Sequence, residues 1–442
     1  MNQIAPLLRN ANLDDVLAEA RARYTAANPK SLARHKAAAA SLPGGNTRAV
    51  LWYKPFPLTL VGGEGCRVED LDGHGYVDLV SEYTAGLYGH SDATIAAAMI
   101  EAIKNGLLLG APNAYEARYA GAIVDRFPAI ERVRFCNSGT EANIMAISAA
   151  RAITKRAKIL VFREGYHGGV LTFAHGGSIL NLPFPFLFAD YNDREGTEAV
   201  LNEHGDGLAA VLIEPMMGGG GCIAAAPAFL SFLRDRTQGL GALLIFDEVM
   251  TSRLAFRGLH GEYGIRPDFV TLGKYLGGGA SFGAFGGRAD LMDRFDPASP
   301  NAFSHGGTFN NNILSMAGGL AGFTKVLTEE ASRKVNAQGD RLRETLNHCL
   351  ASRGIQGVVV GRGSLMNLHF VPGPVETPAA LEAADPKLLE LWQIEMLLRG
   401  QHVTPRGMLA LSLPFGDKEA DGFVDAFDDF LDSYLQLLPC VA

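Results

Sequence analysis

The sequence predicts an α/β protein in which a mostly parallel sheet carries helices on both faces. A smaller α+β domain, formed from the N- and C-terminal segments, accompanies it. Two observations support this prediction. Between about residues 90 and 325, short apolar runs alternate with helical stretches, which is typical of a parallel sheet covered on both sides. Outside that range, helical stretches are combined with short β-rich runs instead.

The central region contains the regular alternation. Apolar runs predict strands over 132–135, 158–162, 209–213, 242–246 and 269–272, and helical spacing predicts helices over 93–105, 140–154 and 227–237. Pro227 suits the first turn of the last of these helices. We therefore expect one large domain over residues 89–328.

The two ends of the chain are expected to pack together as the small domain, from residues 1–88 and 329–442. Residues 12–40 have helical spacing, which Pro43-Gly44-Gly45-Asn46 breaks, and a β-rich stretch follows with a hairpin turn at Asp72-Gly73. The tail predicts a helix over 331–352, strands over 358–360 and 364–370, and a final helix over 421–437.

The composition of the chain argues against several classes of function. The chain has 442 residues, 48% of them hydrophobic and 19% charged, with a formal net charge of −8. This describes an ordinary globular protein and argues against nucleic acid or an anionic membrane as the main partner. The five scattered cysteines lack a CxxC pair, so we expect reduced thiols and no zinc site. No apolar run is long enough for a membrane helix, and no targeting segment is recognised, so the expected compartment is the cytoplasm.

The polar residues at the predicted strand ends matter most, because ligands of α/β sheets bind there. Lys274 follows the last strand inside a glycine-rich stretch. It could be a solvated loop residue, a phosphate clamp or a covalent catalyst. A P-loop is excluded, because Asp268 and Tyr275 stand where glycine and Ser or Thr are required. A dinucleotide fingerprint at 219–224 is disfavoured, because Glu214-Pro215-Met216-Met217 separates the strand from the glycines.

Ser138-Gly139-Thr140-Glu141 follows the first strand and opens the helix 140–154, with Ser138 and Glu141 in capping-box spacing. Hydroxyls and free amides at a helix N-terminus can bind an anion, although simple capping is an equally good explanation. Tyr166, Asp247 and Lys274 are expected on the same rim. A phosphate cradle, an aromatic ring, a carboxylate and a lysine are the groups that pyridoxal 5′-phosphate (PLP) requires.

These residues carry a resemblance to a known family. The motifs, in order, are Asn137-Ser-Gly-Thr-Glu-Ala-Asn143, Gly165-Tyr-His-Gly168, Phe246-Asp-Glu-Val249, Leu272-Gly-Lys274 and Gly307-Thr-Phe-Asn310. From about residue 41 onward the chain resembles the class III aminotransferases, which are PLP-dependent transferases of fold type I. The resemblance implies that fold, PLP as cofactor and a homodimer with shared active sites.

The resemblance also implies residue roles. Lys274 would be the Schiff-base lysine and proton shuttle, and Asp247 would pair with the pyridine nitrogen. Tyr166 would stack on the ring, and Glu214 matches an acidic residue near the cofactor, although strand-end capping remains open for it. The phosphate would be held by Ser138, Gly139 and Thr140, and by Thr308 from the neighbouring subunit.

Within the family the chain is most similar to bacterial β-amino-acid aminotransferases and, less closely, to glutamate-1-semialdehyde aminomutases. The shared motifs include Pro43-Gly-Gly-Asn-Thr-Arg48, Glu82-Tyr-Thr-Ala-Gly86 and Thr404-Pro-Arg-Gly407. The mutases usually continue their Asp-Glu-Val-Met-Thr motif with Gly-Phe-Arg, whereas this chain has Ser252-Arg253-Leu254. The likeness therefore implies transfer of the amino group of an aromatic β-amino acid to 2-oxoglutarate or pyruvate.

Two arginines are candidates for binding substrate, because a planar guanidinium binds carboxylate in bidentate fashion. The resemblance implies that Arg48 holds the carboxylate of the β-amino acid and the distal carboxylate of 2-oxoglutarate. Arg406 would hold the α-carboxylate of the keto acid and move aside for an aromatic side chain. Tyr83, Phe56 and Met217 are expected to give the pocket an apolar lining.

Other functions remain open. A second class III activity, such as an aminomutase, an ω-amine transaminase or a racemase, would use the same cofactor. A non-enzymatic PLP-binding regulator is a third possibility, but residues 1–40 are too short and too mixed in charge for a DNA-binding helix-turn-helix.

Overall fold

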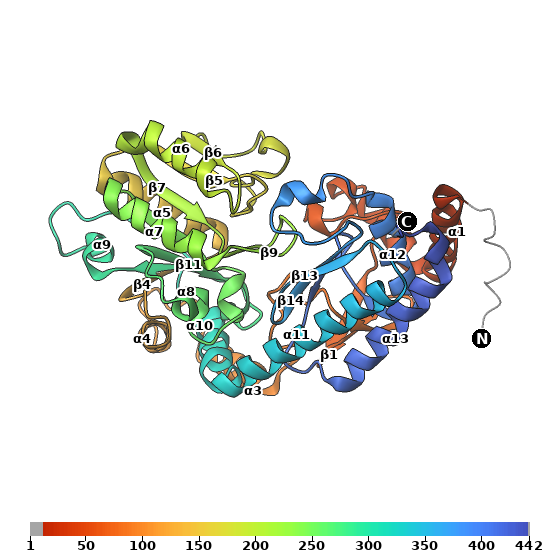
Figure 1. Cartoon of the computed structure of the whole chain (residues 1–442). Helices are drawn as coiled ribbons and strands as arrows, with labels where there is room; N and C mark the ends of the chain where they lie inside the picture. Colours follow the sequence, from red (N-terminus) through yellow and green to blue (C-terminus); the bar gives the residue numbers. More distant parts are fainter. Residues whose placement is uncertain (1–11, 441–442) are drawn as a thin grey trace.

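The computed structural model describes residues 12–440. The first eleven residues of the expected segment 1–88 and the last two of 329–442 lie outside the described residues. The chain forms two lobes that lie side by side (Figure 1). The middle of the sequence builds one lobe, and both ends of the sequence meet in the other.

A seven-stranded sheet forms the centre of the large lobe, with the strand order β4-β12-β11-β10-β7-β5-β6. All neighbouring strands are parallel except β12, which runs antiparallel to β11 and β4. The prediction of a mostly parallel sheet is confirmed. The strands are β4 Arg132–Cys136, β5 Lys158–Phe162, β6 Phe186–Ala189, β7 Leu208–Ile213, β10 Leu243–Asp247, β11 Phe269–Gly273 and β12 Gly283–Gly287.

Helices cover both faces of this sheet, as expected. On β7, Leu212 packs in the same core cluster as Ile147 of α5 (Gly139–Thr154). The neighbouring Ile213 packs instead with Leu230 of α7 (Pro227–Leu240). Successive side chains of a strand point to opposite faces, so an apolar strand contributes to a core on each side. The other helices of this lobe are α3 Ala93–Lys104, α4 Glu116–Arg126, α6 Arg194–His204, α8 Gly258–Tyr263, α9 Ala289–Met292 and α10 Ile313–Ala321.

The small lobe combines the two ends of the chain in one sheet. β1 (Leu60–Glu64), β2 (Arg67–Asp70) and β3 (Gly75–Asp78) form an antiparallel meander, and β15 (Gln401–His402) pairs with β3 in parallel. A second sheet contains β13 Val358–Arg362, β14 Leu365–His369 and β16 Met408–Ala410, and the helices are α1 Leu13–Ala27, α2 Pro29–Ala38, α11 Glu329–Ser352, α12 Pro386–Leu398 and α13 Asp417–Tyr434.

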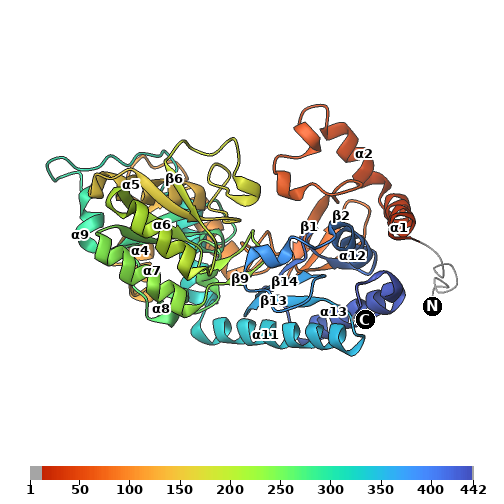
Figure 2. The ribbon, with the colours of Figure 1, turned by 45° about the horizontal axis from the view of Figure 1, so that its top comes forward.

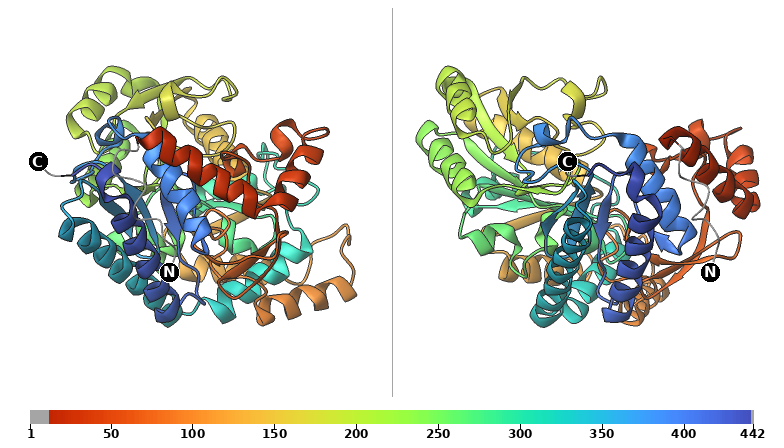
Figure 3. Two further views of the ribbon diagram at one scale, coloured as in Figure 1. Left: turned by 90° about the vertical axis from the view of Figure 1, so that its right-hand side faces the viewer. Right: turned by 45° about the vertical axis from the view of Figure 1, so that its right-hand side comes forward.

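The N-terminal helix α1 lies against α12 on the outside of the small lobe (Figure 3). Arg23 of α1 forms an ion pair with the buried Glu395 of α12. A short hairpin, β8 (Met216–Met217) with β9 (Ile223–Ala224), leaves the large lobe and contacts β13 where the lobes meet (Figure 2). The glycines at 219–221 form the tip of this hairpin, which explains why they do not build a dinucleotide fingerprint. Within residues 12–440 no helix combines the length and apolar character that crossing a membrane requires.

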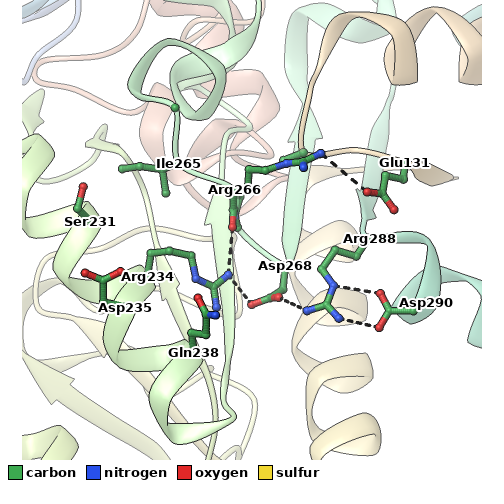
Figure 4. Close-up of a pocket in the computed structure, with 13 residues that line it drawn as sticks. Glu131, Ser231, Arg234, Asp235, Gln238, Ile265, Arg266, Asp268, Arg288 and Asp290 are labelled. Carbon is green, nitrogen blue, oxygen red and sulfur yellow. Dashed lines mark hydrogen bonds and ion pairs between the residues drawn. The ribbon is translucent and has the colours of Figure 1, made fainter.

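A buried carboxylate fixes the amino-terminal edge of the large sheet. Asp268, directly before β11, accepts hydrogen bonds from the backbone N–H of Leu244 (2.8 Å), from Arg234 (2.8 Å) and from Arg288 (2.9 Å). These arginines line a hollow of about 740 Å³, in which Arg288 also contacts Asp290 (Figure 4). The hollow lies at the edge opposite Lys274, because β11 separates Asp268 from Lys274. Each of its arginines is paired with a carboxylate of the same hollow, and these pairs hold the end of the sheet together.

We expect Asp268→Ala to lower the free energy of unfolding by about 3 kcal/mol, because it leaves two arginines and a buried N–H without their acceptor. The loss should be no larger than this because Arg288 is half exposed, so water can replace part of its lost interaction. Denaturant unfolding followed by circular dichroism measures this. Asp290→Ala is the matched control, because Asp290 contacts the same arginine from an exposed position and should cost less than about 1 kcal/mol. Equal losses in the two variants would contradict the structural role of Asp268.

Candidate active site

The predicted polar residues converge at the carboxyl ends of the parallel strands. They line a cavity of about 570 Å³. The large lobe supplies Gly139, Thr140, Tyr166, Glu214, Asp247 and Lys274, and segments of the small lobe supply Arg48, Tyr83 and Arg406. The cavity therefore lies where the two lobes meet.

Asp247 ends β10 and is buried. Its Oδ2 accepts hydrogen bonds from His167 Nδ1 (2.7 Å) and Asn143 Nδ2 (2.8 Å), and its Oδ1 accepts one from the backbone N–H of Val249 (3.0 Å). Asn143 is held in turn by the Thr271 hydroxyl, which donates to its Oδ1 at 2.7 Å. Three donors compensate the loss of hydration of the carboxylate. Asp247 is therefore a carboxylate held in one orientation on the cavity wall.

Lys274 directly follows β11 and lies in a left-handed backbone conformation with φ 55°. A residue other than glycine rarely adopts this conformation, and such strain tends to occur at functional sites. Burial lowers the pKa of the Lys274 amine, while the charges of Asp247 and Glu214 oppose the shift and the cation of Arg253 adds to it. The amine consequently loses its proton at a lower pH than a surface lysine does.

Glu214 follows β7, and its side chain is buried next to the backbone of Tyr166. Its two carboxylate oxygens accept from the backbone N–H groups of Tyr166 (3.0 Å) and Gly218 (3.0 Å). Burial raises the pKa of Glu214; proximity to His167 opposes the shift and the charge of Asp247 adds to it. The Tyr166 ring itself is half exposed. Glu214 thus fixes the backbone at Tyr166 and at Gly218, which agrees with a strand-end capping role.

The N-terminus of α5 closes one end of the cavity. Ser138 is the N-cap and accepts a hydrogen bond from Glu141 N–H (3.1 Å). Glu141 does not complete a capping box, because its carboxylate accepts from Asn137 N–H (2.8 Å) instead of Ser138 N–H. Gly139 and Thr140 line the cavity, whereas the side chain of Ser138 is engaged in the cap. A Cβ on Gly139 would lie 2.7 Å from Val249, so a side chain would not fit this narrow end.

These groups match the chemistry of PLP. A phosphate fits free N–H groups at a helix N-terminus. An aldehyde needs a lysine amine that can lose its proton, and a pyridine nitrogen needs a carboxylate. In this cavity Gly139 and Thr140 of α5 would bind the phosphate. Lys274 would react with the aldehyde, and Asp247 would pair with the pyridine nitrogen.

The part of the cavity that the small lobe supplies contains both predicted arginines. Arg48 forms an ion pair with Glu82, and its guanidinium carbon lies 5.5 Å from the centre of the Tyr83 ring. The Tyr83 hydroxyl donates to the Val50 carbonyl (2.6 Å). Burial raises the pKa of Tyr83, and the positive charges of Arg406 and Arg48 oppose the shift. Arg406 has no ion pair among residues 12–440. Both arginines are therefore close to one aromatic ring.

Besides Ser138, which caps α5, three more predicted residues do not line this cavity. Phe56 is buried in the core of the small lobe, where its ring lies 5.2 Å from that of Tyr24, so the expectation that it lines the pocket is wrong. Met217 is buried in the β8–β9 hairpin and packs in the core around α7. Thr308 is exposed in the loop before α10.

Several residues of the site have contacts that their sequence motifs do not predict. Asn143 and His167 stand inside quoted motifs, but only the fold reveals that both bind Asp247. Asn143 lies four residues after Gly139, on the same face of α5, and this spacing was the available signal. Nothing local indicates that Glu82 contacts Arg48.

Comparisons with known proteins agree with the geometry. The class-III aminotransferase family model matches residues 50–389. The chain is 49% identical to the β-phenylalanine transaminase of Variovorax paradoxus over 98% of this chain and 99% of that protein. The crystal structure of the β-phenylalanine aminotransferase from that organism superposes with a TM-score of 0.96 and covers 97% of this chain and 100% of its own.

Two further matches are more distant in sequence. The glutamate-1-semialdehyde 2,1-aminomutase of Rhodopirellula baltica is 35% identical over 83% of this chain and 88% of that protein. A transaminase structure with PLP bound is 31% identical, with a TM-score of 0.85 over 93% of this chain and 98% of its own. The fold, the cavity and these matches lead to one conclusion: the chain belongs to the class-III aminotransferase family of PLP-dependent enzymes.

Proposed function

We propose that the enzyme transfers the amino group of a β-amino acid, of the aromatic β-phenylalanine type, to 2-oxoglutarate or pyruvate. The observation that carries this proposal is the pair Arg48 and Arg406, which enter one cavity from different segments beside Tyr83. A β-amino acid places its carboxylate one carbon further from the reacting amine than an α-amino acid does. Two separate cations can serve both geometries, whereas one fixed cation serves one of them well.

PLP, when bound, supplies an electron sink for the carbanion at the substrate carbon. The residues of this chain would hold the cofactor and move the proton. Lys274 Nζ would bind the cofactor aldehyde and later carry the proton to and from the substrate carbon, a task that suits an amine with a lowered pKa. Asp247 would keep the pyridine nitrogen protonated, and His167 and Asn143 hold that carboxylate in place.

The remaining roles concern placement of the ring and phosphate. Tyr166 would stack on the ring, and Glu214 would fix the backbone that carries Tyr166. Gly139 and Thr140 would bind the phosphate at the N-terminus of α5, and Ser138 would contribute mainly through its cap.

Arg48 would bind the carboxylate of the β-amino acid in place of Glu82. Because Arg406 has no ion pair among the described residues, it is available for the α-carboxylate of the keto acid. Tyr83 would cover the aromatic side chain between them.

The enzyme would work as a homodimer. The end of α3 and the loop after it expose a run of large apolar side chains. The ribbon of this helix projects from the edge of the molecule (Figure 3, left). A patch of this kind marks a protein interface. The loop packs on the segment before α10, where Asn113 Nδ2 donates to Asn311 O (2.9 Å). Thr308 lies on that segment, so a second copy docked here could receive Thr308 of the partner subunit at its phosphate site. The apolar residues are Ile100, Ile103, Leu107, Leu108, Leu109 and Phe309.

We also propose the cytoplasm as its compartment. All five cysteines are free, and four of them are buried. Thiols persist in this form where the surroundings are reducing.

The function predicts different losses for the two arginines. Arg48→Ala should lower kcat/KM for β-phenylalanine by about 10- to 150-fold, because a charge-assisted hydrogen bond contributes about 1.5–3 kcal/mol. Arg406→Ala should impair the reaction of 2-oxoglutarate and leave amine release from the β-amino acid within a few-fold. Stopped-flow absorbance of each half-reaction separates these effects. Equal losses in both half-reactions for both variants, or a wild type that converts only glutamate-1-semialdehyde, would refute the function.

The role of Lys274 predicts an unusual titration. In cofactor-free protein with 13C-methylated lysines, one NMR signal should titrate below the usual lysine range, because burial favours the neutral amine. Since the pKa is lowered, this amine is neutral at pH values where the other lysines are still charged. Lys274→Arg should remove that one signal. Trapping of the cofactor by borohydride on another lysine would contradict the assignment.

The dimer predicts that Leu108→Asp shifts the enzyme toward monomers, because Leu108 is 81% exposed in the apolar patch. Activity should fall with the dimer fraction if Thr308 acts across the interface. Sedimentation velocity at micromolar concentration measures the assembly. Val61→Asp, at an exposed position on β1, is the control and should leave it unchanged. A wild type that is monomeric and fully active would rule the dimer out.

A further inference from the structure

Arg253 is a buried arginine without a counter-ion. It lies in the single turn after β10, six residues beyond Asp247, and only 1% of its surface is exposed. It forms no ion pair among residues 12–440, and its Nε has no hydrogen-bond partner. Burial lowers the pKa of its guanidinium to about 9. An uncompensated buried charge is costly, and such a residue is expected where function requires it.

The guanidinium binds two backbone carbonyls from opposite ends of the sequence. Nη1 donates to Thr84 O (3.0 Å), and Nη2 donates to Leu411 O. The two segments already run beside each other, because Ala410 N–H donates to Leu79 O (2.8 Å) and Leu413 N–H donates to Leu87 O (2.7 Å). Arg253 thus links the segments around Thr84 and Leu411 to the turn that follows β10.

The first of these segments is a strained turn. Ser81, Glu82, Tyr83 and Thr84 are all left-handed, with φ of 47°, 46°, 51° and 79°. Residues other than glycine adopt this conformation only at a cost, so the surrounding contacts must hold the turn in place. Asp78 Oδ1 holds its entrance by accepting from Val80 N–H (2.9 Å) and Ser81 N–H (3.1 Å). At its exit, the Thr84 carbonyl is held by Arg253.

This turn carries residues of the substrate end. Glu82 contacts Arg48, and the Tyr83 ring lies beside it. The second segment continues from Arg406 and Met408, which line the same cavity. A shift of the turn would therefore displace the groups that face the substrate carboxylate, while Lys274 and Asp247 would stay in place.

We propose that Arg253 is a positioning residue that fixes the carboxylate-binding end of the cavity relative to Lys274. This inference rests on the proposed use of Arg48 and Tyr83 for a carboxylate-bearing amine. Arginine suits the task because its rigid fork can donate to two carbonyls at once, whereas a lysine offers a single point of attachment.

The test compares amines with and without a carboxylate. Holoenzyme with Arg253→Met or Arg253→Lys is mixed with β-phenylalanine or with 1-phenylethylamine, and stopped-flow absorbance gives the apparent KM and limiting rate of each first half-reaction. Arg156→Met is the matched control. Arg156 also donates to two backbone carbonyls, those of Leu208 (3.2 Å) and Leu240 (2.7 Å), but at the other edge of the sheet.

We expect both Arg253 variants to raise the apparent KM for β-phenylalanine about 10- to 100-fold, the loss typical of misplaced binding groups. Arg253→Lys keeps the positive charge that adds to the lowered pKa of Lys274, so its limiting rate and its reaction with 1-phenylethylamine should stay within a few-fold of wild type, as should all parameters of Arg156→Met. In Arg253→Met the lost charge should change the limiting rates of both amines by the same factor. Hydrogen exchange should become faster in the peptide covering 79–87. If Arg253→Met does not fold, Arg253→Lys decides the question by the same measurements.

Two results would overturn the inference. One is an unchanged KM for β-phenylalanine in folded variants, and the other is an equal rise in KM for both amines, which indicates a purely structural role. Failure of the proposed function is a separate outcome, because wild type would then react with no β-amino acid. The comparison would in that case use the carboxylate-bearing amine that wild type does accept, and an effect no larger than that of Arg156→Met would again reject the role of Arg253.

Discussion

The buried carboxylate of Asp247 is the constraint on which the site depends. A carboxylate in a low-dielectric interior persists in its charged form only when donors replace its hydration. Here α5 supplies Asn143, the segment after β5 supplies His167, and the chain after β10 supplies the Val249 N–H. Meeting this requirement ties together three segments that follow β4, β5 and β10, which are not adjacent in the sheet. The same charge opposes the depression of the Lys274 pKa and adds to the elevation of the Glu214 pKa.

The second constraint is that the substrate end comes from outside the large sheet. The parallel pairing of β15 with β3 brings the two ends of the chain into one sheet, and Arg406 and Tyr83 thereby reach the same cavity. The cofactor end of the cavity is built on strand ends, whereas the substrate end is built on turns. Rigid elements suit a cofactor that is common to a family, and loops suit groups that vary with the substrate.

The sequence predicted the large lobe well, because apolar strands and amphipathic helices have distinct periodicities. It missed β12, since Gly283–Gly287 has too few side chains for a strand pattern. The structure explains the glycines: a Cβ on Gly283 would lie 2.1 Å from Ser138 O, and one on Gly287 would lie 2.0 Å from Asp268 O. The motif residues of the site were found because strand ends converge. Phe56 was misplaced, because an aromatic residue in a loop has no local signal that separates a pocket from a core.

Arg48 and Arg253 show that the same type of residue can have two different functions in one site. The ion pair of Arg48 with Glu82 is largely exposed to solvent, so it contributes no more than about 1 kcal/mol. In the proposed function a substrate carboxylate would therefore replace Glu82 at little cost, and the guanidinium would keep a partner throughout. Arg253 is the reverse case, because its partners are backbone carbonyls and water cannot replace them in the core. Its removal leaves Thr84 O and Leu411 O without that donor, at the exit of a turn that is already strained. In the proposed function the partner of Arg48 would be exchanged for the substrate, whereas Arg253 would keep its backbone partners throughout.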